Sequence, residues 1–296
     1  MELIQVGEKT YYIKNNTNIG IYKVGENDVY LIDTGNDKEA GRKILKIINE
    51  QGWNVKAIIS THSNADHIGG NHIIQNRTNC TIYAHNIEKA FTENPILEPA
   101  FLYGGNPFKD LKNKFLFAKG TATVTPIENN LPEGLEYFEL KGHFFDMIGI
   151  HTSDDVYFLA DALFNEITIT KYHLFFIYDV KEFLNTLDKL TTLKGNLYIP
   201  SHCEATNDIS TLIKLNRDKV QEITNKIYNI CKKELTFEEI LKAIFDEYNL
   251  SMNANQYVLV GSTIKSYLSY LCDENKICYE FKDNKMLWKQ VEKAKG

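Results

Sequence analysis

The segment from residue 60 to residue 70 constrains the fold of this chain more than any other. Its two histidines and one aspartate, His62, Asp66 and His67, lie within six positions. A mostly apolar run over residues 55–59 precedes them and is typical of a buried strand, and a glycine pair and a predicted helix over residues 71–75 follow. A strand-to-helix loop allows these side chains to converge on one point. Imidazole nitrogens and carboxylate oxygens are donors that zinc or iron prefers, so the segment predicts a metal site.

Bulk composition indicates an ordinary globular protein. The chain has 296 residues, of which 43% are apolar and 24% charged, and no stretch approaches the ~20 apolar residues of a membrane span. The N-terminus lacks the basic and apolar regions of a signal peptide. Five cysteines, without close spacing, argue against a disulfide framework and for a reducing compartment. We therefore expect a soluble, cytoplasmic protein that does not contact membranes.

Residues 1–208 alternate between strand and helix patterns. Antiparallel hairpins combined with βα units predict a layered α/β sandwich rather than a doubly wound sheet. One stretch, residues 95–120, departs from this alternation because it combines glycines and prolines with several Phe and Tyr side chains. Such a segment is typical of a lid or substrate wall. An irregular surface insertion packed by its own aromatic side chains explains it equally well.

Residues 209–296 form a second unit in which helices are followed by a hairpin. Helical patterns are expected over residues 209–231, 236–248 and 255–271, and a β-hairpin over 276–289. This order resembles a winged helix. From Ser210 on, 14 basic residues face 12 acidic ones, and the earlier part has 19 against 27. Because a nucleic-acid-binding surface needs a far larger positive excess, the unit is better interpreted as a packing or dimerisation module, and a homodimer stays open.

The 60–70 segment resembles the metal-binding signature of the metallo-β-lactamase superfamily, Thr-His-x-His-x-Asp-His, except that Asn64 replaces the second histidine. Four more motifs follow in the family's order: residues 31–35, 140–143, 158–163 and 199–202. The resemblance covers roughly residues 3–205. It implies a four-layer αββα metallo-β-lactamase sandwich, followed here by the small, mostly helical, winged-helix-like C-terminal domain.

The resemblance also implies a set of metal ligands and one supporting residue. The implied ligands are His62, Asn64 and His143 for a first metal, Asp66, His67 and His202 for a second, and Asp161 between the two. Asp33 would support the site from behind the ligands. An amide oxygen is a weaker donor to zinc than an imidazole, so a strong second site and a weak or empty first site are expected. The expected cofactor is one or two zinc ions, and iron or manganese would tolerate the Asn64 oxygen better.

The resemblance implies a metal-dependent hydrolase. A metal-bound hydroxide would attack an ester, thioester, lactone or related small organic substrate, with Asp66 orienting it and taking up a proton. Two alternatives stay open. One is a phosphodiesterase or RNA nuclease of the lactamase-like type, which the acidic composition disfavours. The other is a metal-binding sensor whose hydrolysis Asn64 has weakened.

Three further side chains are candidates for contacting the substrate. His85 follows a predicted strand, His173 lies between the motif at 158–163 and the next helix, and Tyr103 belongs to the aromatic segment. A structural role is favoured for His85, and His173 and Tyr103 are explained equally well as loop or packed side chains.

Overall fold

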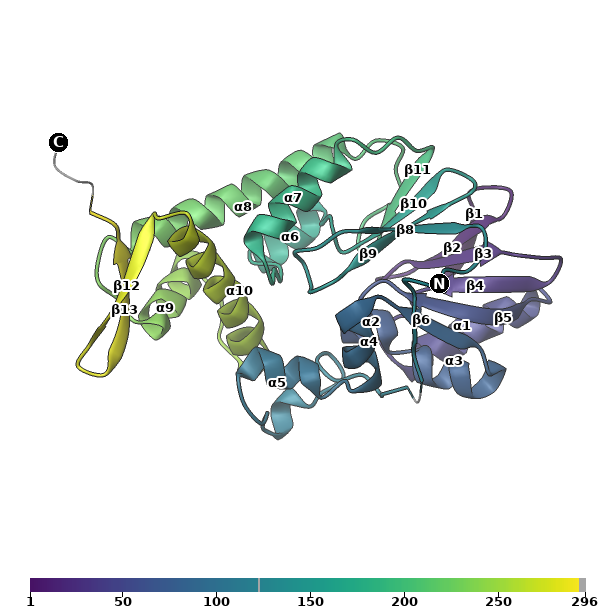
Figure 1. Cartoon of the computed structure of the whole chain (residues 1–296), viewed down its shortest axis with the longest axis horizontal. Helices are drawn as coiled ribbons and strands as arrows, with labels where there is room; N and C mark the ends of the chain where they lie inside the picture. The colour runs from purple at the N-terminus through teal and green to yellow at the C-terminus, as the bar shows by residue number, and fades with distance from the viewer. Residues whose placement is uncertain (122, 293–296) are drawn as a thin grey trace.

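The computed structural model describes residues 1–121 and 123–292. Two sheets and the helices beside them form the larger part of the molecule, on the right of Figure 1. The first sheet has the strand order β1-β2-β3-β4-β5-β6-β7 and the second the order β11-β10-β9-β8. The strands of the first sheet are β1 (Glu2–Gln5), β2 (Thr10–Lys14), β3 (Ile19–Lys23), β4 (Asp28–Ile32), β5 (Asn54–Ser60), β6 (Thr81–Ala84) and β7 (Thr125–Pro126). Those of the second are β8 (Leu135–Glu139), β9 (Ile148–Thr152), β10 (Val156–Ala160) and β11 (Leu197–Pro200).

Helices cover the outer faces of both sheets. The segments between strands β4 and β11 contain α1 (Lys38–Glu50), α2 (Ala65–Ile68), α3 (Asn71–Thr78), α4 (Asn86–Glu93), α5 (Leu97–Tyr103), η1 (Lys109–Leu111), α6 (Glu166–Tyr172) and α7 (Val180–Leu190). Helix α1 begins at Asp37, whose side chain accepts hydrogen bonds from two backbone N–H groups of its first turn. Asp179 caps α7 by accepting one such hydrogen bond, from the backbone N–H of Glu182, as its sequence predicts.

Successive side chains of a strand point to opposite faces of the sheet, and this alternation produces the layers. In β2, Ile13 is buried among the side chains of α1, whereas its neighbour Tyr12 is buried between the two sheets. Three apolar clusters result: one beneath α1 and α3, one between the sheets, and one beneath α7. The predicted four-layer αββα sandwich is therefore confirmed.

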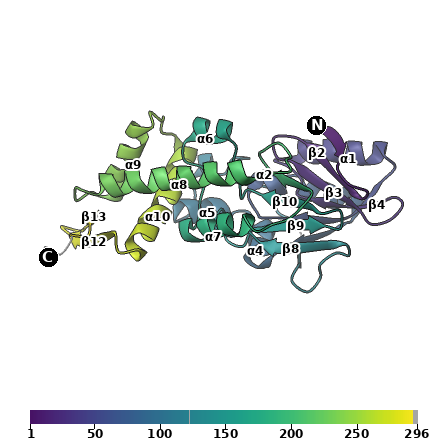
Figure 2. The ribbon, with the colours of Figure 1, turned by 90° about the horizontal axis from the view of Figure 1, so that it is seen from above.

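The C-terminal region extends away from the sandwich (Figure 2). It consists of α8 (Ser210–Ile230), α9 (Phe237–Glu247) and α10 (Ala254–Asp273), followed by a hairpin of β12 (Ile277–Lys282) and β13 (Lys285–Gln290). The predicted capping box is present at the start of α9, between Thr236 and Glu239. One apolar cluster runs continuously from α7 into these helices. The boundary at residue 208/209 and the likeness to a winged helix stay predictions.

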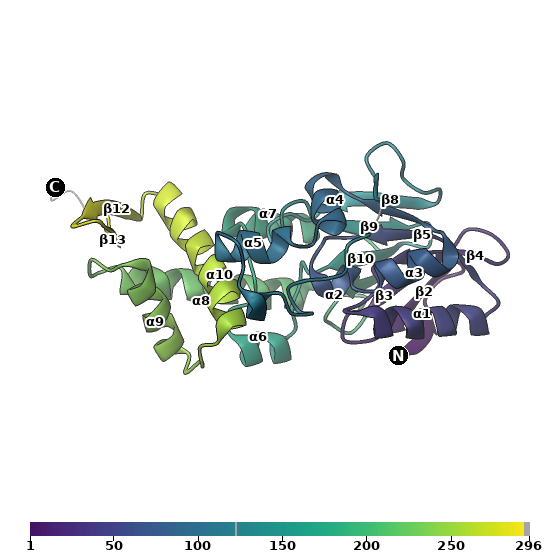
Figure 3. The same cartoon turned by 90° about the horizontal axis from the view of Figure 1, so that it is seen from below.

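The aromatic segment of residues 95–120 is packed against the C-terminal region. Its helix α5 lies beside α10 in Figures 1 and 3, and Leu102, Leu111 and Leu116 form a small cluster with Val258 of α10. Contacts with the C-terminal helix α10 therefore help to fix the position of this segment. Among the described residues, no helix combines the length and apolar character that crossing a bilayer requires.

Candidate metal centre

The candidate ligands meet at one edge of the sandwich because several strands end there. Strands β4, β5 and β6 are parallel neighbours, as are β10 and β11. The carboxyl ends of parallel strands lie at the same edge of a sheet. Asp33 follows β4, the loop from Thr61 to His67 follows β5, Asp161 follows β10 and His202 follows β11. The fold thus brings together side chains that are up to 169 positions apart, from Asp33 to His202.

Two glycines allow the loop after β5 to pack closely behind the site. A Cβ atom on Gly69 would lie 2.3–2.5 Å from backbone atoms of Asn36 and Asp37, and one on Gly70 would lie 2.4 Å from the Thr34 carbonyl oxygen. Only glycine fits where backbones approach this closely. Thr34 also donates its backbone N–H and its hydroxyl to the His67 carbonyl oxygen, at 2.8 and 3.1 Å. The loop is therefore held against the end of β4.

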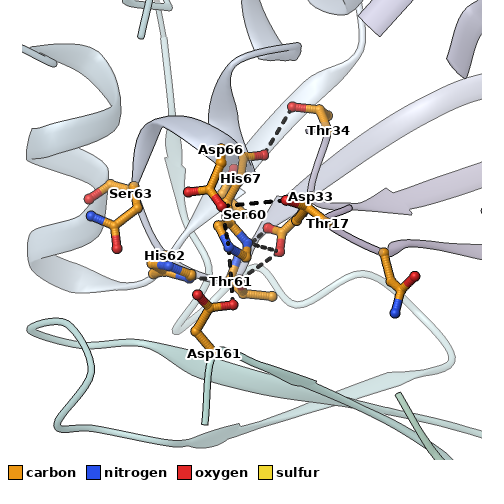
Figure 4. A network of polar contacts seen from close by, with 12 residues as sticks. Thr17, Asp33, Thr34, Ser60, Thr61, His62, Ser63, Asp66, His67 and Asp161 are labelled. Atoms are coloured by element: carbon orange, nitrogen blue, oxygen red, sulfur yellow. Dashed lines mark hydrogen bonds and ion pairs between the residues drawn. The ribbon is translucent and has the colours of Figure 1, made fainter. Parts of the chain in front are cut away.

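Two groups of potential metal donors lie at this edge. Potential donor atoms of His62, His143 and Asp161 all lie within 4.8 Å of one another, and so do those of Asp66, His67 and His202. Asp161 also approaches the second group, with 3.2 Å from its Oδ1 to His67 Nε2 and 3.2 Å from its Oδ2 to His202 Nε2. Figure 4 shows His62, His67, Asp66 and Asp161 directed toward a common space.

Hydrogen bonds on the outer side of each imidazole fix the direction of its inner nitrogen. In all four histidines Nδ1 is within hydrogen-bond distance of an oxygen atom of the protein. The distances are 3.1 Å from His62 to Thr61 Oγ1, 2.8 Å from His67 to Asp33 Oδ2, 2.9 Å from His143 to the Phe176 carbonyl and 2.8 Å from His202 to the Asn16 carbonyl. Such contacts place the proton on Nδ1 and leave Nε2 as the donor atom for a metal.

Asp33 supports this arrangement from behind. Besides contacting His67, it accepts hydrogen bonds from the backbone N–H of Thr61 at 2.8 Å and from its hydroxyl at 2.7 Å. Because the Thr61 hydroxyl donates to Asp33, its oxygen is free to accept from His62 Nδ1–H. One carboxylate thereby orients a histidine of each group (Figure 4).

Buried atoms without partners show that the site suits a cation. Nε2 of His62, Nε2 of His67 and Oδ1 of Asp161 are buried and form no hydrogen bond, although the last two lie 3.2 Å apart. Leaving such atoms without a partner is costly, and all three are directed toward the same space. Imidazole nitrogens and carboxylate oxygens together form a donor set for a divalent metal. The residues present therefore fit a metal ion.

Electrostatic surroundings differ between the histidines. Burial, together with the neighbouring His67, holds the pKa of His62 well below its usual value, and burial also lowers the pKa of His143. Burial acts to lower the pKa of His67 and His202 too, but the carboxylates around them overcome this effect, so both pKa values lie well above the usual value. For Asp66 and Asp161, burial opposes ionisation, yet the nearby histidines lower the pKa of both carboxyls.

Asn64 occupies the N-cap position of α2 but does not cap it. Its side chain forms no capping hydrogen bond, although asparagine is one of the preferred capping residues. Instead its Oδ1 lies 3.1 Å from His143 Nε2, and its Nδ2 donates to Glu98 Oε1 at 2.7 Å. The amide thus lies beside the first group, with its oxygen toward His143.

The three predicted substrate contacts lie outside this cluster. His85 packs on Tyr137, with ring centroids 5.4 Å apart. His173 stacks on Tyr248 of the C-terminal region at 4.8 Å. Tyr103 lines a surface cavity of about 350 Å³ between α5, α9 and α10. Contact of these side chains with a substrate stays a prediction.

Two buried glutamates beside the metal loop have no counterpart in the sequence-based prediction. Glu88 of α4 accepts hydrogen bonds from the backbone N–H and hydroxyl of Ser63 and from the backbone N–H of Asp146. Burial raises the pKa of Glu88 to about 7. Burial also raises the pKa of Glu98, against the effect of its hydrogen bond from Asn64. Nothing in the sequence distinguishes these two from surface glutamates, because only the packing of α4 and α5 buries them.

The fold and the ligand-rich edge together define an α/β protein with a candidate metal centre, and comparisons with known proteins place it in a family. The sequence model of the metallo-beta-lactamase superfamily matches residues 13–202. The chain therefore belongs to the metallo-beta-lactamase superfamily. Members of this superfamily are generally metal-dependent hydrolases, and the predicted resemblance is confirmed at this level. No curated protein matches the chain at a significant level.

Solved structures extend the likeness in fold to nearly the whole chain. A beta-lactamase domain protein from Burkholderia ambifaria superposes with a TM-score of 0.76 at 16% identity, covering 98% of this chain and 94% of that one. A metallo-beta-lactamase family protein from Thermus thermophilus gives 0.71 at 18% identity, covering 98% of both chains. The metallo-beta-lactamase DIM-1 gives 0.52 at 14% identity, with 75% of this chain and 97% of that chain covered.

Proposed function

We propose that this protein is a metal-dependent hydrolase that acts on an ester, thioester, lactone or related small organic substrate. The observation that carries the proposal is the shared orientation of four imidazoles. Each has Nδ1 beside an oxygen atom of the protein. On the other side of the rings, Nε2 of His67 and of His202 lies 3.2–3.7 Å from both Asp66 and Asp161, and Nε2 of His143 lies 3.6 Å from Asp161. Such an arrangement costs free energy without a cation to compensate it.

The proposed ligands are those of the two groups. His62, Asn64 and His143 would hold one metal, Asp66, His67 and His202 the other, and Asp161 would contribute to both. A divalent metal such as zinc, when bound there, lowers the pKa of a coordinated water toward neutrality. Nucleophilic attack then needs no serine or cysteine.

Asp66 is the proposed catalytic carboxylate. It is more exposed than Asp161 and the histidine ligands, with 41% of its side chain accessible. Its Oδ2 lies 3.3 Å from His202 Nε2 and accepts a long hydrogen bond from the Thr17 hydroxyl at 3.4 Å. A carboxylate held in this way can orient a water molecule and take up its proton at Oδ2.

Charges around the site favour a small organic substrate over a polyanion. In the part of the chain that the structure describes, the ion pairs of Asp66 and Asp161 are formed with histidines and not with Lys or Arg. Phosphate-rich substrates are normally bound by Lys and Arg. Aromatic rings lie close instead: Phe164 and Phe176 are each 5.7 Å from the His143 ring.

The test is a hydrolysis assay with the metal-loaded protein. We expect turnover of p-nitrophenyl esters or thioesters that chelation abolishes. Asp66→Asn should lower kcat about 10²–10⁴-fold, as loss of a general base does. The metal content of the variant is measured so that loss of metal is distinguished from loss of the base. Asp208→Asn, at an exposed carboxylate before α8, is the matched control and should leave turnover unchanged.

Two results would contradict the proposal. Cleavage of labelled RNA or bis-p-nitrophenyl phosphate without any ester hydrolysis would favour the nuclease alternative. A metal-loaded protein inactive on both panels, but activated by Asn64→His, would favour a sensor.

A further inference from the structure

The buried Glu98 and the partly buried Asn64 form a hydrogen-bonded pair that the family signature does not contain. Glu98 belongs to α5, in the segment of residues 95–120, and is only 4% exposed. Burying a carboxyl group costs free energy unless it is hydrogen-bonded. Its one side-chain hydrogen bond in the described structure comes from Asn64 Nδ2, at 2.7 Å.

The two ends of the Asn64 amide differ as metal donors. The carbonyl oxygen has lone pairs for a cation, whereas the NH₂ group only donates hydrogen bonds. Whether Asn64 acts as a ligand therefore depends on which end faces the first group. Hydrogen-bond partners determine the orientation of such an amide.

His143 by itself would favour the unproductive orientation. Its Nδ1 lies 2.9 Å from the Phe176 carbonyl oxygen, which accepts only, so the proton of a neutral imidazole is held at Nδ1. The remaining Nε2 is an acceptor and would attract the NH₂ end of Asn64. In the structure it faces Asn64 Oδ1 instead, at 3.1 Å. Two acceptor atoms 3.1 Å apart, with no hydrogen between them, have the separation of neighbouring ligands of one cation.

We propose that Glu98 is a positioning residue that turns the oxygen of Asn64 toward the first metal. Its Oε1 accepts from the NH₂ group and so leaves Oδ1 facing His143 Nε2. This inference rests on the proposed metal centre and deepens it, because it assigns Asn64 as a ligand that needs a partner. The first site is then completed by a residue of the α5 segment.

The C-terminal region takes part in this arrangement through α5. Leu102, one turn beyond Glu98, is buried in a cluster with Val258 of α10. The Asn113 side chain, from the same segment, donates to Asn255 Oδ1 at 2.9 Å. Contacts thus run from α10 through α5 to Glu98, and from Glu98 to Asn64.

The test follows metal binding rather than turnover. Co²⁺ is titrated into metal-free full-length protein, and visible absorption reports the ligands of each bound ion. We expect two binding steps, the weaker belonging to the first group. Glu98→Leu removes the acceptor and should weaken that step about 10–100-fold, the usual effect of losing a group that orients a ligand. The stronger step should stay unchanged.

The Glu98→Leu substitution made in an Asn64→Asp protein separates a positioning role of Glu98 from a merely structural one. Asn64→Asp has an oxygen at both ends of the side chain, so an oxygen faces the first metal whichever way the group is turned. Its carboxyl group also lies next to that of Glu98. In this background Glu98→Leu should strengthen the weaker step, which reverses the sign of its effect. Double-mutant cycles measure such coupling directly.

Each outcome decides the question. A loss of similar size in both backgrounds, or two unchanged steps in Glu98→Leu, overturns the proposal. If Glu98→Leu does not fold, the double variant Asn64→Asp with Glu98→Gln is used, because it keeps one hydrogen bond between the two positions. Two retained Co²⁺ steps in this variant support the inference, and loss of the weaker step overturns it. Absence of both steps in the native protein would instead refute the metal centre itself, whereas inactivity with both steps present would refute only hydrolysis.

Discussion

The two halves of the candidate metal centre are built in different ways. Asp66 and His67 belong to the short helix α2 after β5, His202 follows β11, and Asp33, which orients His67, follows β4, so all of them lie on the sandwich. The first half has His62 and His143 in similar positions, but its third member, Asn64, contacts a helix outside the sandwich. One half therefore depends on the geometry of a sheet edge and the other on how an added segment packs. The same edge can thus carry one site that follows the family signature and one that has departed from it.

The halves should also differ in how metal binding depends on pH. Without metal, the raised pKa of His67 and His202 favours their protonated form, whereas the lowered pKa of His62 and His143 favours their neutral form. A metal must displace the protons of the second half only. Above pH 6.5, and until the raised pKa values are passed, its affinity should rise about tenfold per pH unit for each proton, or ~100-fold for two.

Co²⁺ titrations at pH 6.5, 7.5 and 8.5 measure this difference. We expect a steep rise with pH in the stronger step and a nearly constant weaker step. Equal slopes for the two steps would mean that the histidines of both halves carry the same charge before metal binds.

A mutation that creates a cavity between α5 and α10 should weaken metal binding at the first half of the centre more than at the second. Leu102→Ala removes a buried side chain and should lower the free energy of unfolding by about 2–5 kcal/mol. Since Glu98 lies on the same short helix, the weaker Co²⁺ step should decrease as well. Ile240→Ala, in the buried face of α9, is the matched control and should cost similar stability without affecting either step. Equal metal binding in both variants would show that α10 does not support the site.

The sequence alone predicts those site residues whose place depends on their immediate neighbours or on the end of a strand. The loop from His62 to His67 is local, and a carboxylate or histidine directly after an apolar run predicts a place at the sheet edge, as for Asp161. Glu98 is different, because nothing near it in the sequence shows that it is buried or that it contacts Asn64, 34 positions away. Its role arises from the packing of α5 on α10, a contact between residues more than 150 positions apart. Likewise, the sequence predicts Asn64 as a weakened ligand but not the partner that orients it.

Glu88 of α4 contacts the first half of the metal centre from behind, and its ionisation can be measured. Its carboxyl accepts three hydrogen bonds, two of them from Ser63, between His62 and Asn64. Burial nevertheless dominates and raises its pKa from 4.5 to about 7. A group whose pKa is higher in the folded state stabilises it fully below the unfolded pKa and loses this contribution as pH rises. At about 1.4 kcal/mol per pH unit, the folded state should lose ~3 kcal/mol from this group between pH 4.5 and pH 7.

The measurement is urea unfolding of metal-free protein and of Glu88→Gln across this range. Histidines of the second half also change stability with pH, but they do so equally in both proteins, so the difference between the two isolates Glu88. We expect the native chain to lose about 3 kcal/mol relative to the variant as pH rises from 4.5 to 7. A constant difference would mean that the three hydrogen bonds offset burial, so that the Glu88 carboxyl ionises alike in the folded and unfolded chain.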